Sequence, residues 1–173
     1  MKRRPLPDAE YLRSLFRYDP ETGHLYWRED RAQMKAGDIA GHLGEKDGRY
    51  VRVSVDRKIY RGHLLIWKMV TGRDPVAQID HKNTVKNDNR WMNLREATKS
   101  QNQANIGLIA ANKSGFKGVS RYRQGEAWGK PWQSAITKDG KHYHVGHFAT
   151  KEEAAEAYRL KAIELYGDFA RFK

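Results

Sequence analysis

The first element that the hydrophobic pattern predicts is a short helix near the start of the chain. Leu12, Leu15 and Phe16 recur at helical spacing, so they would share one apolar face. Asp8 precedes this stretch, and its short carboxylate suits the N-cap position, where it accepts hydrogen bonds from the free N–H groups of the first turn. The pattern therefore predicts a helix that begins after Asp8.

The next segments have the patterns of short antiparallel strands. Residues 19–23 have the composition of a turn, and residues 24–27 have that of a strand. Residues 50–55 alternate with a period of two, as a half-buried strand does. The polar residues 56–58 would then turn the chain into a partner strand at 59–60. We therefore expect a small antiparallel sheet in this part of the chain.

The period changes to that of a helix at residue 63. Apolar residues cover most of the circumference of residues 63–70. Gly72, with Pro75 beyond it, is typical of a helix end, because glycine adopts the left-handed conformation that closes the last turn. The polar stretch that follows, residues 78–106, carries the candidate chemistry.

The last part of the chain predicts three strands. They are expected at residues 116–122, 132–137 and 142–148. The pair Asp139-Gly140 lies between the last two, and this dipeptide is typical of a two-residue hairpin turn. The three strands would therefore form an antiparallel sheet.

A helix is expected directly after this sheet. Thr150 and Glu153 have the spacing of a capping box, in which each side chain bonds the other residue's backbone N–H. A sheet of three strands under one helix is small, so it needs every apolar position of that helix to form a core. The buried face of the helix is expected to comprise Ala154, Ala155, Tyr158, Ala162 and Leu165.

These elements predict the α+β class and two domains. The first domain is expected to span residues 1–110, with a β-rich part over about 1–62 and the chemistry-bearing part over about 63–106. The polar segment 111–115 is the predicted linker, and residues 116–173 form the second domain. A length of 173 residues suits this division into two small domains.

Composition excludes several classes of protein. The chain has no cysteine, which excludes a disulfide scaffold, a thiolate zinc site, a cysteine nucleophile and an iron–sulfur cluster. The longest apolar runs, 64–67 and 106–111, are far shorter than the roughly 20 residues that cross a bilayer. The basic start, residues 1–5, lacks the apolar segment of a secretory signal. A soluble protein with no membrane association is therefore expected.

Net charge favours a polyanionic partner. The formal charge is +12, from 33 Lys and Arg against 21 Asp and Glu. Lysine and arginine that neutralise phosphates release condensed counterions, so such a chain has affinity for nucleic acid before any base is contacted. The 5 Trp and 9 Tyr among these cations can pack on sugars or bases. A solubilising surface charge and attraction to anionic lipid are the alternatives.

One cluster in the polar stretch suits phosphodiester hydrolysis. Asp80 and His81 are adjacent, and neighbours in a strand point to opposite faces, so one could bind a metal ion while the other faces a substrate. Mg²⁺ prefers oxygen ligands and often takes only one or two protein groups, so a side-chain amide from a later helix could complete its set. A neutral histidine can take the proton of the attacking water near neutral pH. Each residue alone is more typical of a turn or of a hydrogen-bonded structural pair.

Together these residues resemble the HNH endonucleases, specifically the phage-type homing and nicking group. The residues that carry the resemblance are Asp80-His81, 87–95 and 100–102, with His63 to Trp67 and Gly72 upstream. The resemblance covers about residues 63–105, and it implies a β-hairpin and a helix around one divalent ion, Mg²⁺ or another such as Mn²⁺.

The resemblance also implies roles for single residues. Asp80 and Asn102 would be the metal ligands, and His81 would be the general base. Asn93 would hold the hairpin loop through backbone hydrogen bonds and so orient His81. Many relatives have His where this chain has Asn102, and Asn105 lies one turn further along the helix, so the choice between the two amides stays open. The four-cysteine zinc site of many relatives is impossible here.

His63 has two interpretations. It could approach a DNA phosphate near the metal, or it could be a structural hydrogen-bonding residue at the start of an apolar helix.

The last part of the chain resembles the Apetala/ethylene-response-factor DNA-binding domain. The matching residues are 116–119, 132–136, 145–148, 150–158 and 167–170. That family lays its three-stranded sheet in the major groove, with the helix on the other face. Plant members have Arg or Trp where this chain has Ser120, Thr137 and His144, so their target sequence is not transferable.

The resemblance and position together indicate candidate contacts to double-stranded DNA. They are Lys117, Arg121, Arg123, Lys130 and Lys141. The alternative is a solvated basic face. His142, His144 and His147 invite a metal site, but three histidines on an exposed strand are more typical of DNA-facing or surface groups.

The sequence therefore predicts a metal-dependent DNA endonuclease of the HNH type, homing or nicking, that acts on double-stranded DNA. By resemblance it would be encoded by a phage or bacterium and act in the cytoplasm, with no obligatory protein partner. Two alternatives stay open, a non-catalytic sequence-specific DNA-binding protein or regulator and an RNA-binding module, although no RNA-binding motif is recognisable.

Overall fold

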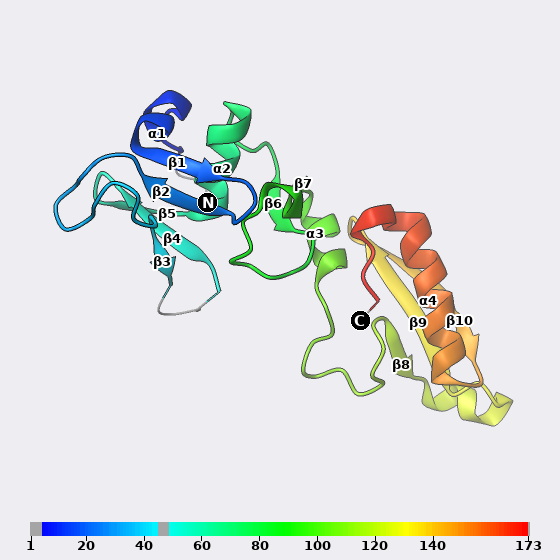
Figure 1. Ribbon diagram of the computed structural model, residues 1–173. Helices are drawn as coiled ribbons and strands as arrows, with labels where there is room; N and C mark the ends of the chain where they lie inside the picture. Colours follow the sequence, from blue (N-terminus) through cyan, green and yellow to red (C-terminus); the bar gives the residue numbers. More distant parts are fainter. Residues whose placement is uncertain (1–4, 45–48, 173) are drawn as a thin grey trace. The chain divides into compact units, whose positions relative to one another are not determined.

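The computed structural model of the chain describes residues 5–44 and 49–172 (Figure 1). The chain divides into two compact units, residues 1–97 and 98–173. Each unit combines short helices with small antiparallel sheets, as the predicted α+β class requires. The basic start, apart from Pro5, lies outside the described residues.

The described residues of the first unit, 5–44 and 49–97, form two helices, seven short strands and a single 3-10 turn. In chain order these are α1 (Ala9–Leu15), β1 (Phe16–Asp19), β2 (His24–Trp27), β3 (His42–Leu43), β4 (Val51–Val55), β5 (Lys58–Arg61), α2 (Gly62–Thr71), β6 (Gln78–His81), η1 (Trp91–Asn93) and β7 (Leu94–Ala97).

The predicted first helix is confirmed. The carboxylate of Asp8 accepts hydrogen bonds from the backbone N–H groups of Glu10, at 2.8 Å, and Tyr11, at 3.3 Å. Leu12 and Leu15 are buried on the face that the spacing predicted. The helix stops at Leu15, because the chain continues directly into a strand.

That strand, β1, was not predicted. It pairs antiparallel with β2, so that Phe16 lies opposite Trp27 and Asp19 lies opposite His24. The turn between them is the predicted one, and the carboxylate of Asp19 accepts the N–H of Glu21 at 3.0 Å. The sequence did not indicate β1 because the strand has only four residues and only Phe16 is buried, so there is no alternation of apolar and polar positions to recognise.

The predicted hairpin at residues 50–60 and the helix after it are confirmed. β4 pairs with β5, and β3 adds a short third strand on the other edge of β4. Asp56 and Arg57 turn the hairpin with φ angles of 49° and 61°. α2 ends at Gly72, whose φ of 74° is the left-handed conformation of a helix end.

The helices and sheets of this unit share one apolar core. α2 contributes most to it, because apolar residues surround its axis as the sequence indicated. Burying such side chains removes roughly 1.5–3 kcal/mol of unfavourable hydration each. The most deeply buried members include Leu12, Phe16, Ala40, Val53, Val55, Leu65 and Ile66.

Between residues 98 and 172, the described part of the second unit, there are two helices, three strands and two 3-10 turns. They are α3 (Lys99–Asn105), β8 (Val119–Arg121), η2 (Arg123–Trp128), β9 (Trp132–Lys138), β10 (Lys141–Phe148), α4 (Lys151–Tyr166) and η3 (Gly167–Phe169).

The predicted three-stranded sheet and its helix are confirmed, with changes in detail. The strand order is β10-β9-β8, all antiparallel, and α4 packs on the sheet. β8 is shorter than predicted, because the chain forms the 3-10 turn η2 before β9. A bulge between His144 and Gly146 shifts the register of β10 against β9. The predicted Asp139-Gly140 turn has the two positive φ angles that its hairpin type requires, 50° and 79°.

The capping box at the start of α4 is present, and its buried face differs slightly from the predicted one. Thr150 accepts the N–H of Glu153 at 3.2 Å, while the Glu153 carboxylate accepts the N–H of Thr150 at 3.4 Å. Ala155 and Leu165 are only half-buried, and Tyr166 is buried instead. The buried positions of α4 are Ala154, Tyr158, Ala162 and Tyr166.

The boundary between the units falls earlier than the predicted domain boundary. Residues 98–110, assigned by sequence to the first domain, include α3, which belongs to the second unit. Ala104 is part of the core under α4, and the Ser100 hydroxyl lies 2.9 Å from the Tyr166 hydroxyl. Seven residues are too few for a helix to be stable alone, so α3 depends on this packing.

The predicted linker, residues 111–115, is an ordered turn. The Asn112 amide donates to the backbone oxygen of Phe116 at 2.8 Å and accepts the N–H of Gly115 at 2.7 Å. The buried Ser114 hydroxyl donates to the backbone oxygen of Val119 at 2.8 Å. These bonds tie the segment to the start of β8.

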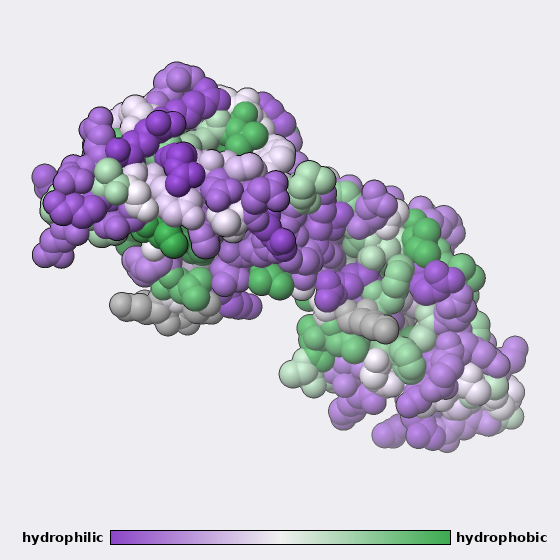
Figure 2. Space-filling view, viewed as in Figure 1, coloured by the Kyte–Doolittle hydropathy of each residue, from purple (hydrophilic) through white to green (hydrophobic). Residues whose placement is uncertain are grey.

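Hydrophilic side chains cover most of the face of the first unit that Figure 2 shows. No helix in the described part of the chain is both long and apolar enough to span a membrane.

Candidate active site

Asp80 and His81 end strand β6, and both are buried. Their residue exposures are 1% and 0%. β6 pairs with β7, so that Asp80 lies opposite Arg95 and His81 lies opposite Leu94. Burial of a carboxylate and an imidazole requires specific partners, because an uncompensated buried polar group costs several kcal/mol. The partners of each side chain therefore define the site.

The imidazole of His81 is held by Asn89. Its Nε2 lies 3.0 Å from the amide Oδ1 of Asn89. An amide oxygen only accepts hydrogen bonds, so Nε2 carries the proton in the neutral ring. Nδ1 then carries the lone pair, and this is the atom that can accept a proton from water.

Asn89 is itself fixed by the fold. It is buried, and its backbone oxygen accepts the hydroxyl of Tyr18 at 2.9 Å. Gly23, in the β1–β2 turn, packs so closely on this backbone that a Cβ there would lie 2.6 Å from the carbonyl carbon of Asn89. Sequence inspection missed Asn89, because in the run 87–89 its amide looks like any other turn residue.

Burial lowers the pKa of His81 below its usual value of 6.5. The positive charge of Lys86 lowers this pKa further, while the hydrogen bond to Asn89 and the carboxylates of Asp80 and Asp88 oppose the shift. The imidazole is therefore neutral at pH 7, the form that acts as a base.

Asn93 ties together the loop that follows His81. Its side-chain oxygen accepts the N–H of Asn83 at 2.9 Å, and its amide donates to the backbone oxygen of Asp88 at 2.7 Å. Its backbone oxygen accepts the N–H of Lys82 at 2.9 Å. Asn93 thus bonds backbone at both ends of the loop, and its bonds reach the residue next to His81 rather than the ring.

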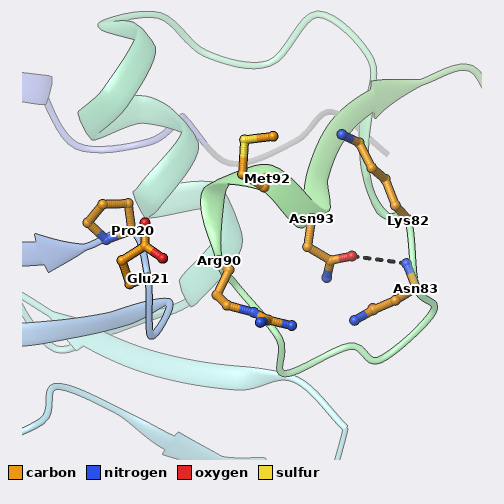
Figure 3. Close-up of a pocket in the computed structure, with 7 residues that line it drawn as sticks. All are labelled: Pro20, Glu21, Lys82, Asn83, Arg90, Met92 and Asn93. Atoms are coloured by element: carbon orange, nitrogen blue, oxygen red, sulfur yellow. Dashed lines mark hydrogen bonds between the residues drawn. The ribbon is translucent and has the colours of Figure 1, made fainter.

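An open cavity of about 590 Å³ lies beside this loop. Figure 3 shows the residues that line it, with the Asn93 side chain pointing to Asn83. Asp80 and His81 do not line this cavity. It is lined by Pro20, Glu21, Lys82, Asn83, Arg90, Met92 and Asn93.

Two cations face the carboxylate of Asp80. Arg95 approaches Oδ2 through Nε at 3.2 Å and Nη2 at 3.1 Å. The ammonium of Lys86 lies 3.8 Å from Oδ1. The two carboxylate oxygens therefore have different environments, a close guanidinium on one side and a more distant ammonium on the other.

His63 lies next to the ring of His81. The two ring centres are 5.1 Å apart and the rings are nearly perpendicular, at 89°. Tyr50 covers both rings, at 5.5 Å from His63 and 6.2 Å from His81, and the guanidinium of Arg61 lies 4.3 Å from the centre of the Tyr50 ring. His63 is buried, so the structure places it beside the predicted base, within a layer of rings.

A divalent metal ion suits the oxygens of Asp80, which are the hard ligands that Mg²⁺ and Mn²⁺ prefer. Oδ1 fits best, because Oδ2 already accepts two bonds from Arg95. Asn102 is half-buried and Asn105 is buried, and both lie on α3 in the second unit. The pairing of either amide with Asp80 therefore stays a prediction. Within residues 5–44 and 49–172, no group of three or more His, Asp or Glu could hold a metal ion.

The five cations predicted to contact DNA all lie in the second unit, and they differ in exposure and in their partners. The ammonium of Lys117 donates to the backbone oxygens of Ala104 and, at 2.6 Å, Ile106, so it closes the end of α3 instead of projecting outward. Arg121 is exposed and pairs with Glu126 at 2.8 Å. Arg123, Lys130 and Lys141 are exposed.

Rings gather near the start of η2 and the end of β10. The ring centre of His147 lies 4.4 Å from that of Tyr122 and 4.6 Å from that of His144. Trp128, which is 63% exposed, lies 6.3 Å from His147. His144 and His147 of β10 thus pack among other rings, whereas Nδ1 of His142 lies 3.3 Å from the Thr137 hydroxyl.

Comparison with known proteins finds a match to the chemistry-bearing part of the chain, which begins in the first unit and ends in the second. A family model described as HNH endonuclease matches residues 60–104. Protein 3.8 of Escherichia phage T7 is 32% identical over 117 residues, which cover 67% of this chain and 93% of that protein. An uncharacterized HNH endonuclease of Acanthamoeba polyphaga mimivirus is 31% identical over 120 residues, and the match covers 68% of this chain and 59% of that protein. No solved structure matches the chain.

Proposed function

We propose that this chain is an HNH endonuclease, a metal-dependent enzyme that hydrolyses phosphodiester bonds in double-stranded DNA, since a family model of that description matches residues 60–104. The observation that carries the proposal is the buried pair of His81 and Asn89. The pair assigns the proton to Nε2, and burial keeps the ring neutral at pH 7. His81 is then the general base that accepts the proton of the attacking water at Nδ1.

Asp80 and the amide of Asn102, or of Asn105 in its place, would hold Mg²⁺ or Mn²⁺. When bound, the ion supplies Lewis-acid stabilisation of the charge on the phosphoryl and leaving oxygens. Arg95 would orient the Asp80 carboxylate through its bonds to Oδ2. Asn93 holds the loop that carries Asn89, and through it the base.

The second unit would bind duplex DNA and position the cut. Its likeness in sequence to the Apetala/ethylene-response-factor domain, together with its three-stranded sheet and exposed cations, supports this role. Arg123, Lys130 and Lys141 are the best-supported contacts, because their side chains are exposed. Arg121 would first have to leave Glu126.

One catalytic centre in one chain cuts one strand, so nicking is the expected reaction of the monomer. A role in homing, in which a cut promotes the spread of the gene itself, rests on the resemblance to phage homing and nicking enzymes.

A plasmid assay tests the proposal. Supercoiled DNA is incubated with the protein in Mg²⁺, in Mn²⁺ or in EDTA, and nicked and linear products are separated. Wild type should yield nicked circles only with metal, and His81→Ala should reduce the rate by about 10²–10⁴-fold. His42→Ala, which removes an exposed imidazole of β3, is the matched control and should leave the rate unchanged.

Other outcomes would contradict the proposal in different ways. Equal cleavage by wild type and His81→Ala would exclude His81 as the base. Tight, salt-sensitive binding of duplex DNA without cleavage in either metal would indicate a non-catalytic DNA-binding protein. A preference for RNA over duplex DNA in direct competition would indicate an RNA-binding module.

A further inference from the structure

We propose that Lys86 binds the substrate phosphate in this site, and that in the free protein its ammonium rests on the Asp80 carboxylate, from which the substrate draws it away. The inference rests on the proposed nuclease function, because it names a further residue of the same site. It concerns this chain's own side chains, and it is testable without cleavage.

The position of Lys86 is the first argument. It lies in the loop between β6 and β7, and its Nζ is 3.8 Å from Oδ1 of Asp80. Its side chain is only 23% exposed, and that of Asp80 is fully buried. A lysine ammonium is strongly hydrated, so holding it at this depth requires a compensating anion.

The charge balance is the second argument. Asp80 is already paired with Arg95 through Oδ2, so Lys86 is the second cation on one carboxylate. Burial lowers the pKa of Lys86, the carboxylate of Asp80 opposes this shift, and the positive charges of Arg49 and Arg61 add to it. Arg95 and Lys86 therefore place two positive charges on one carboxylate, an excess of one positive charge. A phosphodiester, with one negative charge per phosphate, would offset it.

The place of this charge is the third argument. The guanidinium of Arg61 packs on Tyr50, and Tyr50 contacts the ring of His81. Lys86 is close enough to His81 to lower the pKa of the imidazole. The excess of positive charge is therefore located beside the base, where the phosphate must lie for its attacking water to reach Nδ1.

The three observations assign Lys86 two partners in turn. In the free protein, its ammonium shares the Asp80 carboxylate with Arg95. In the complex with DNA, it donates to a non-bridging oxygen of the phosphate, and Oδ1 of Asp80 becomes accessible to a metal ion. No proton is transferred in this exchange. A lysine that was only a structural counter-ion of Asp80 would stay where it is.

Exchange predicts that removing the ammonium changes two affinities in opposite directions. In Lys86→Met, duplex DNA binding in EDTA should weaken about tenfold, because a charge-assisted hydrogen bond to phosphate is lost. The slope of log affinity against log salt should fall by about one. Affinity for Mn²⁺ in the absence of DNA should rise about tenfold, because the cation that competes for Oδ1 is gone.

The measurements use the full chain. DNA binding is measured by fluorescence anisotropy in the His81→Ala background, so that no product forms. Mn²⁺ binding is measured by titration calorimetry, and Asp80→Asn defines the binding that is unrelated to this site. Lys82→Met is the matched control, since Lys82 is an exposed lysine of the same loop. It should leave Mn²⁺ affinity unchanged.

A second pair of variants guards against a folding defect. Lys86→Gln keeps polarity without charge and should reproduce both shifts, and Lys86→Arg keeps the charge and should keep DNA affinity within about threefold. Circular dichroism establishes that each variant is folded.

Two results would overturn the proposal. One is a fall of DNA and Mn²⁺ affinity together in folded Lys86→Met and Lys86→Gln, as expected for a merely structural lysine. The other is no change in either affinity. Failure of the proposed function is a different result. If the wild type binds DNA and Mn²⁺ but never cleaves, while the Lys86 variants still change the two affinities in opposite directions, the nuclease function is excluded and the role of Lys86 in binding stands. A wild type that cleaves, with no shifts in the variants, excludes only the role of Lys86.

Discussion

Nε2 of His81 lies 3.0 Å from the amide oxygen of Asn89, and both side chains are buried. The two residues come from opposite ends of one loop, which Asn93 holds closed. The structure therefore orients the imidazole through Asn89, while Asn93, the residue indicated by the family resemblance, maintains the loop around it.

Replacement of Asn89 should change the pH profile as well as the rate. In Asn89→Ala, the ring loses the partner that fixes its orientation, and we expect kcat to fall about 10–100-fold. In Asn89→Asp, a carboxylate would stabilise the protonated ring, so the acidic limb of the kcat/KM profile should move to higher pH. Nicking rates measured from pH 5 to 9 test this. An unmoved limb in Asn89→Asp would mean that Asn89 does not contact the base.

The wild-type pH profile follows from the lowered pKa of His81. Since burial depresses this pKa below 6.5, activity should persist below pH 6.5 and be lost only as the ring becomes protonated. The same group affects stability. The unfolded chain binds a proton at about pH 6.5 and the folded chain does not, so the free energy of unfolding should fall as pH decreases below 6.5. Urea unfolding from pH 5 to 8 should show a weaker dependence in His81→Ala.

Gly23 should be irreplaceable for two separable reasons. Its φ is +76°, and a Cβ would lie 2.5 Å from the backbone nitrogen of Arg90. Gly37 has a φ of +91° but no atom within 4 Å of a built Cβ. Gly37→Ala should therefore cost only the backbone strain, about 1 kcal/mol, whereas Gly23→Ala should cost about 2–4 kcal/mol. Urea unfolding of the two variants measures the difference, and equal costs would contradict the contact.

Lys117 should distinguish support of the fold from DNA binding. Its ammonium bonds the end of α3, so Lys117→Met should lower the stability of the protein and keep duplex affinity within about twofold. The double variant Arg123→Ala and Lys130→Ala should weaken binding of all duplexes and reduce the salt slope by about two. Anisotropy titrations at several salt concentrations test both. A large loss of affinity in folded Lys117→Met would restore the original expectation for this residue.

Lys117 also predicts a pH dependence above neutrality. Burial, with a smaller effect from Arg171, lowers its pKa from 10.5 to about 8. Between these two values the unfolded chain binds more protons than the folded one, so this group makes the free energy of unfolding rise with pH. Between pH 8 and 10, wild type should therefore gain stability relative to Lys117→Met. A constant difference between the two proteins would show that the ammonium is not buried.

The sequence alone determined the elements whose signals are local. Asp8 caps the first helix, Asp139-Gly140 turns the last hairpin, and Thr150 with Glu153 caps α4. Each signal acts over two to four residues, because a cap or a tight turn is formed by neighbours in the chain. The prediction that Asp80 and His81 point to opposite faces of a strand is equally local, because it needs only the alternation of side chains along a strand.

Contacts between distant segments were decided by the tertiary structure. α3 packs with the second unit because Ala104 enters the core under α4, and Lys117 turns inward because that helix end needs a donor. No pattern within α3 shows which core it joins. A small apolar residue such as Ala104 could pack equally well in the core of either unit.

In the candidate site, too, some features followed from the sequence and others only from the tertiary structure. Residue types and order identified Asp80 and His81, but the sequence could not show that Asn89 reaches the ring or that Lys86 reaches the carboxylate. Both lie in a polar loop where asparagine and lysine are ordinary. Their roles depend on how the loop folds back over β6, and that path follows from bonds made by Asn93 and from the close approach of Gly23, neither of which is local.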